Sequence, residues 1–120
     1  MGYESRLVIV RKSKLNADNK VVWAEHIADV NLCVVGNCVA KFRAYPPTNC
    51  YFYDRGVDEP IVEDMYGDKL NEIPLADAIQ ILEDAEKEEH YRRYVIAIGL
   101  LKSFTYDDWC DDIVVLHYGY

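Results

Sequence analysis

Four aspartates flank a tryptophan and a cysteine near the end of the chain, and this stretch has the residue types of a metal-binding loop. It consists of Asp107, Asp108, Trp109, Cys110, Asp111 and Asp112. Hard cations such as Mg²⁺ and Ca²⁺ bind carboxylate oxygens. However, the stretch lacks the glycine and the terminal glutamate of a calcium-binding loop, and solvated acidic loops are commoner than metal sites. We therefore expect a loop that faces solvent or a partner, and no bound metal.

A nucleophile and a general base could be assembled from Cys110 and His117. The sequence specifies no third group that would orient such a pair. The chain also lacks a phosphate-binding loop, a glycine-rich dinucleotide turn, a nucleophile elbow and a His-Glu-x-x-His helix. We therefore predict a protein that is not an enzyme and uses no cofactor, with His117 as an ordinary residue of a strand.

The cysteines are expected to be reduced thiols. No two of Cys33, Cys38, Cys50 and Cys110 are spaced as Cys-x-x-Cys, which weakens the case for structural zinc or a redox site. Cys33 and Cys50 lie in apolar runs, where a thiol behaves as a small hydrophobic side chain.

Carboxylates and tyrosines recur together in the second half of the chain. Exposed tyrosine offers a large contact area at low entropic cost, and rows of carboxylates can stand in for phosphates before a groove of Lys and Arg. An acidic surface can also serve solubility alone. We predict a surface that imitates nucleic acid and binds a partner protein. The predicted partner-binding residues are Asp54, Asp58, Glu59, Glu63, Asp64, Tyr66, Asp107, Asp108, Asp111 and Asp112.

The charge of the chain is uneven. The formal net charge is −8, yet residues 1–50 carry seven Lys or Arg against four acids, whereas residues 51–120 carry six against seventeen. Such asymmetry repels nucleic acid and favours a partner with a basic surface. We therefore expect a protein partner and no direct binding of nucleic acid.

Length and composition indicate one globular domain over residues 1–120. The chain is 51% hydrophobic and 28% charged, as in ordinary globular proteins, and its length suffices for one core. No run approaches the ~20 consecutive apolar residues of a membrane span, and the first residues do not form a signal peptide. We therefore expect no membrane association and a cytoplasmic location.

Six runs in the sequence have the character of strands. They cover residues 6–12, 21–35, 38–44, 50–53, 61–66 and 113–117. In the second run, alternation of apolar residues predicts one core face. That face consists of Ala24, His26, Ala28, Val30, Leu32 and Val34.

Two helices are expected between the fifth and sixth runs. Pro74 fits the first turn of a helix with an apolar stripe from Leu75 to Ala85. The apolar run 95–101 predicts a helix enclosed on all sides, with Gly99 permitting a close approach. The fold class predicted is α+β: a mainly antiparallel sheet of about five to six strands, two helices on one face and a C-terminal strand.

Four stretches carry a resemblance that spans most of the chain. They are Met1 to Val10, Glu63 to Asp68, Tyr91 to Lys102 and Val114 to Tyr120. Together they resemble small uncharacterised proteins of phages and prophages of Gram-positive bacteria. The resemblance brings no motif of defined chemistry and no catalytic residue. It implies a context in which small accessory proteins often inhibit or modulate host machinery, as anti-CRISPR and other anti-defence proteins do.

We therefore expect a phage-type accessory protein that binds and inhibits or modulates a host protein in the bacterial cytoplasm. Its acidic, tyrosine-rich surface would occupy a basic nucleic-acid groove, as an anti-defence inhibitor would. The alternative, from another class, is a domain that binds a small ligand, such as a nucleotide or a divalent metal at residues 107–112.

Overall fold

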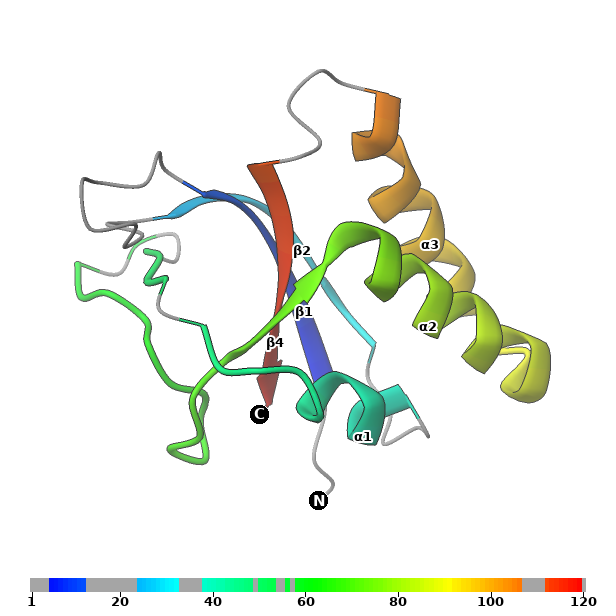
Figure 1. Cartoon of the computed structure of the whole chain (residues 1–120), viewed down its shortest axis with the longest axis horizontal. Helices are drawn as coiled ribbons and strands as arrows, with labels where there is room; N and C mark the ends of the chain where they lie inside the picture. Colours follow the sequence, from blue (N-terminus) through cyan, green and yellow to red (C-terminus); the bar gives the residue numbers. More distant parts are fainter. Residues whose placement is uncertain are drawn as a thin grey trace.

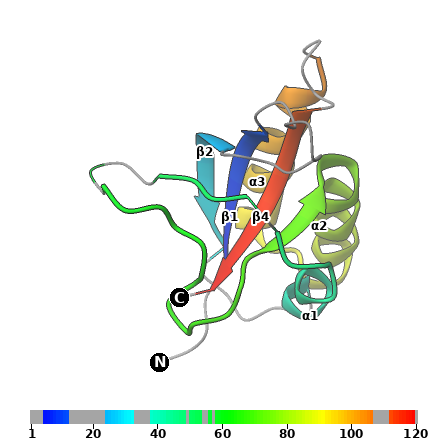
Figure 2. The same cartoon turned by 60° about the vertical axis from the view of Figure 1, so that its left-hand side comes forward.

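The computed structural model describes residues 5–12, 24–32, 38–48, 50–53, 56, 58–106 and 112–119. In these residues an antiparallel sheet has helices on one face and an irregular segment, the described part of residues 50–70, on the other (Figures 1 and 2). The helical elements are α1 (Cys38–Arg43), α2 (Leu75–Glu89), α3 (Arg92–Ser103) and the 3-10 turn η1 (Phe104–Tyr106).

Two β-branched runs, one toward each end of the chain, pair at the centre of the sheet. β1 (Ser5–Lys12) and β4 (Ile113–Gly119) are antiparallel neighbours. β2 (Ala24–Asn31) pairs with the other edge of β1, and β3 (Asn71–Pro74) pairs with the other edge of β4. The strand order β2-β1-β4-β3 places the final strand inside the sheet.

The two faces of β1 contribute to two separate hydrophobic clusters. Leu7 and Ile9 pack in the cluster beneath the helices, whereas Val8 and Val10 pack against the irregular segment. All four side chains are fully buried. Because successive side chains of a strand point to opposite faces, an unbroken apolar run such as this one requires cover on both sides.

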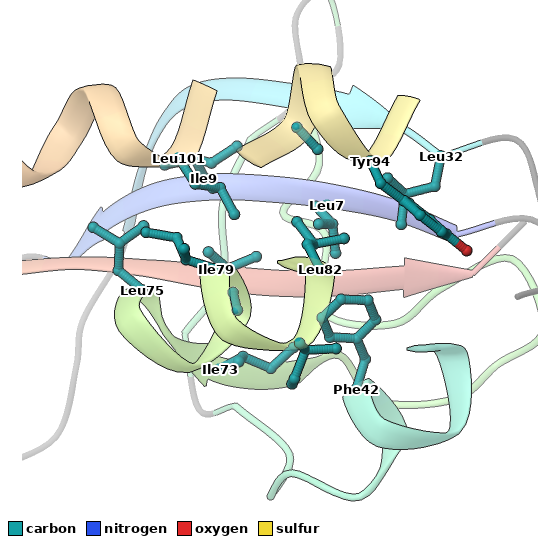
Figure 3. Close-up of a cluster of buried hydrophobic side chains, with 14 of the residues drawn as sticks. Leu7, Ile9, Leu32, Phe42, Ile73, Leu75, Ile79, Leu82, Tyr94 and Leu101 are labelled. Carbon is teal, nitrogen blue, oxygen red and sulfur yellow. The ribbon is translucent and has the colours of Figure 1, made fainter. Parts of the chain in front are cut away.

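α2 and α3 cover the first face of the sheet. Tyr94 and Leu101 of α3 and Phe42 of α1 are buried in the same cluster as Leu7 and Ile9 (Figure 3). None of the described helices is long and apolar enough to cross a membrane. The predicted apolar stripe of α2 is confirmed, since its members are buried: Leu75, Ala78, Ile79, Leu82 and Ala85.

α3 is not enclosed on all sides, contrary to the prediction. Val95 and Ile96 are 52% and 56% exposed. A Cβ built on Gly99 would meet nothing within 4 Å among the described residues, so the predicted close approach there is also wrong. A helix that is apolar all round is usually buried, and this one instead leaves an apolar face uncovered.

The predicted strand over residues 38–44 is a helix. Ala40 and Lys41 have high helix propensity, and the helix places Phe42 in the core with no exposed surface. Lys41 and Arg43 lie in the last turn, where the helix dipole favours positive charge.

The predicted strands 50–53 and 61–66 form only isolated bridges, from Phe52 to Ile61 and from Glu63 to Lys69. The described residues therefore contain four strands, rather than the five to six predicted. β3 was not predicted because it has four residues and ends at Pro74, which also caps α2.

A β-bulge changes the faces of β2. Ile9 pairs with Ala28 but Val10 pairs with His26, so Ile27 is an extra residue. Ala24 consequently lies in the cluster of the irregular segment, whereas Ala28, Val30 and Leu32 pack beneath the helices. The predicted single core face of this strand is therefore wrong. Strict alternation would put all its members on one face, but the inserted residue shifts the alternation, so that side chains before and after the bulge point to opposite faces.

Two alanine variants test this arrangement of the helices: one truncates the buried Leu82 and the other truncates the exposed Ile96. Leu82→Ala should lower the free energy of unfolding by about 2 to 5 kcal/mol, because it leaves a cavity in the core. Ile96→Ala should change it by less than about 0.5 kcal/mol, since its side chain is 56% exposed. Urea denaturation measures both variants, and equal losses would contradict the placement of α3.

Candidate functional site

The acidic segment, residues 58–66, carries four carboxylates and no Lys or Arg. Two buried residues, Phe52 and Leu70, fix the chain on either side of it in the cluster formed with Val8 and Val10. Ile61 packs against this cluster, and its N–H donates to the carbonyl of Phe52 over 2.8 Å. The acidic segment is thus held against the sheet by its apolar flanks.

A tight turn ends the acidic segment. Asp64 Oδ1 accepts hydrogen bonds from the N–H groups of Tyr66 and Asp68, at 2.8 and 3.0 Å. Gly67 has φ +80°, a conformation that glycine adopts without strain. The N–H of Met65 donates to the carbonyl of Gly119 over 3.1 Å, which ties the turn to the end of β4. Asp64 therefore shapes the turn.

The rest of the acidic segment presents both charge and apolar area. Asp58, Glu59 and Glu63 are exposed and form no ion pair with any described residue. Val62 and Met65 are 53% and 70% exposed, and Tyr66 of the same segment is 55% exposed. Large hydrophobic side chains among carboxylates on a fixed backbone are typical of a contact surface.

Asp112, another predicted binding residue, lies elsewhere. It precedes β4 and is 3.8 Å from Arg11, whereas Met65 contacts the far end of that strand. At about 3.3 Å per residue, seven residues separate these ends by roughly 20 Å. Four predicted binding residues lie outside the described residues: Asp54, Asp107, Asp108 and Asp111.

Basic partners neutralise several of the other described carboxylates. Asp68 is 3.6 Å from Arg43, and Glu83 is 3.7 Å from Lys102. These exposed pairs contribute little stability, but they reduce the negative potential around them. In contrast, Asp58, Glu59 and Glu63 have no ion pair among the described residues, and they belong to the same segment as exposed Val62 and Met65.

His117 is buried and bound within the fold. Its Nε2 lies 2.9 Å from Ser5 Oγ, and its ring stacks on Phe42 at a centroid distance of 5.6 Å. Burial lowers the pKa of His117 to about 4; Asp64 opposes this effect and Arg43 adds to it. His117 is thus a neutral, structural residue of β4, as predicted, and Cys110 lies outside the described residues. Ser5 was not predicted as its partner, because nothing in the sequence links positions so far apart.

Cys50 is also structural. The side chain is 2% exposed, and its Sγ lies 3.5 Å from Glu72 Oε1. Burial raises the pKa of the Cys50 thiol, which lowers the fraction of reactive thiolate at neutral pH. The part of the chain that the structure describes contains no group of three His, Cys, Asp or Glu residues that could hold a metal.

A hollow of about 430 Å³ lies beside the start of α2. Its charged lining consists of Lys12 and Glu72, whose Nζ and Oε2 atoms are 2.7 Å apart. Because each charge neutralises the other, the described lining offers no unpaired cation for a nucleotide phosphate.

The buried state of His117 predicts a loss of stability in acid. The folded pKa of about 4 is below the ordinary value of 6.5, so the unfolded chain binds more protons between these values. His117 should therefore remove on the order of 3 kcal/mol of stability as the pH falls from about 6.5 to 4. In His117→Asn this contribution should vanish.

Urea denaturation at pH 7, 5.5 and 4 gives the free energy of unfolding of the wild type and of His117→Asn. The difference between the two proteins should change with pH by the contribution of His117. His90→Asn is the control, because His90 is exposed and its φ of 49° suits asparagine. An identical pH dependence in wild type and His117→Asn would contradict the buried, neutral state.

Comparisons with known proteins do not place the chain in a family. No protein-family model, no curated protein and no solved structure matches it.

Proposed function

We propose that this protein binds a partner protein through the acidic segment and so inhibits or modulates that partner. The observation that carries the proposal is the combination, on one anchored segment, of exposed Asp58, Glu59 and Glu63 with exposed Val62 and Met65. The carboxylates favour a basic partner surface. The exposed apolar side chains favour a partner surface that also contains apolar residues, which become buried in the interface.

The anchoring of the acidic segment supports binding because it lowers the entropic cost of association. Hydrogen bonds from Ile61 to Phe52 and from Met65 to Gly119 hold the segment before a partner arrives. A surface that is already ordered loses less conformational freedom on binding than a flexible loop does. Tyr66 and Met65 then offer contact area at fixed positions.

A nucleic-acid-binding protein of a bacterial host is the partner class that we propose. Its basic groove would meet Glu59 and Glu63 as it meets phosphates. In this form of the proposal the chain is a phage accessory protein, an anti-defence inhibitor that blocks the groove. The exposed apolar residues add contacts that phosphates lack, and they would allow one groove to be distinguished from another.

Charge reversal within the acidic segment tests the proposal. Immobilised wild-type protein should retain a basic protein from bacterial lysate at low salt and release most of it at high salt, because screening weakens exposed charge contacts. Glu59→Lys and Glu63→Lys should each lower the affinity for the purified partner about tenfold or more, which corresponds to ~1.4 kcal/mol. Calorimetry provides the affinities.

Glu88→Lys is the matched control, since Glu88 is an exposed residue of α2 and the charge change is the same. A partner bound equally by Glu63→Lys and Glu88→Lys would reject the acidic segment as the contact. A variant with Lys at positions 107, 108, 111 and 112 provides the second arm. Loss of binding in that variant alone would assign the contact to residues 107–112 instead.

A further inference from the structure

A hollow of about 440 Å³ lies between the first half of α3 and the end of β2, on the helix-covered side of the sheet. Its lining consists of Val30, Asn31, Tyr91, Arg92, Arg93 and Ile96. Ile96 is 56% exposed and belongs to the uncovered face of α3. The acidic segment, in contrast, packs with the cluster on the other face. The hollow is therefore a second surface, independent of the proposed function.

The hollow is basic within a chain of net charge −8. Among the described residues, its lining contains Arg92 and Arg93 and no carboxylate. Arg92 is exposed and forms no ion pair in the described ranges of the chain. The neighbouring acid Glu89 accepts a hydrogen bond from the hydroxyl of Tyr94 at 2.6 Å. The guanidinium of Arg92 is thus available for a carboxylate, which it can bind with two parallel hydrogen bonds.

The hollow adjoins the edge of the sheet that β2 forms. β2 is an outer strand, with β1 as its neighbour on one side and no described strand on the other (Figure 2). The N–H of Leu32 donates to the carbonyl of Ser5. Since bonded and non-bonded pairs alternate in an antiparallel ladder, Asn31 and Asp29 direct their backbone groups away from β1. Both residues are exposed.

The contact of Arg93 shows that a backbone carbonyl at this edge can accept a hydrogen bond from a donor outside the sheet. Arg93 Nη1 donates to the carbonyl of Asn31 over 3.1 Å. The backbone groups of Asp29 and the N–H of Asn31 face the same side of the strand. An extended peptide lying there would find backbone partners on β2 and basic side chains on α3.

We infer that β2 and α3 together bind an extended, acidic segment of a partner protein, which adds to the sheet as a further strand. An apolar side chain of the segment enters the hollow against Val30 and Ile96, and the carboxylates on either side of it contact Arg92 and Arg93. Backbone pairing supplies affinity and the pocket supplies specificity, as in other cases of strand addition. Repulsion between two copies of charge −8 disfavours a second copy of this chain as the occupant.

Titration of the ¹⁵N-labelled full chain with two synthetic peptides tests the inference. One peptide alternates valine with glutamate, and the other alternates valine with lysine. The glutamate peptide should shift the amide signals of Asn31, Arg92 and Ile96 saturably, and the lysine peptide should leave them unchanged. Arg92→Glu should lower the affinity for the glutamate peptide tenfold or more.

Lys41→Glu is the matched control, because Lys41 is an exposed residue of α1 and the charge change is the same; its affinity should stay within twofold of wild type. The amide spectrum of each variant confirms that it folds. The inference is overturned by an absence of saturable shifts up to millimolar peptide, by shifts confined to residues 58–66, or by equal affinity in Arg92→Glu. Self-association that Arg92→Glu abolishes, seen by sedimentation, would also overturn it and assign the hollow to a second copy.

Discussion

The pairing of β1 with β4 is the constraint on which the rest of the structure depends. These two strands lie side by side at the centre of the sheet, and both are buried on both faces. One face supports α2 and α3, and the other supports the irregular segment. The same pairing places Ser5 beside His117 and brings Gly119 to the turn at Met65. Both candidate surfaces are positioned by it.

The elements that the sequence predicted well are those whose pattern is long and local. β1 and β4 are β-branched runs, and α2 repeats its apolar residues at helical spacing. The failures required information from elsewhere in the fold. α1 forms because Phe42 finds a buried site beside His117, and the bulge at Ile27 becomes visible only in the register with β1.

The acidic segment was predicted from its carboxylates alone, and the structure adds what they lie beside. Exposure of Val62 and Met65 could not be predicted, because an apolar residue in a short run is buried or exposed according to what packs on it. Neutralisation by distant residues, as of Asp68 by Arg43, is likewise invisible in the sequence. The place of Asp112 at the opposite end of β4 from Met65 follows from strand direction. Local charge was therefore predictable, and its distribution over the molecule was not.

Amide hydrogen exchange of the free protein tests most directly whether the acidic segment is a preformed surface. The N–H groups of Ile61, Asp64 and Met65 donate to the carbonyls of Phe52, Asp68 and Gly119. Their exchange should be at least about tenfold slower than in an unstructured peptide, because exchange requires these bonds to open. Exchange of all three at the rate of an unstructured peptide would show that the segment is not held against the sheet, and would contradict the account.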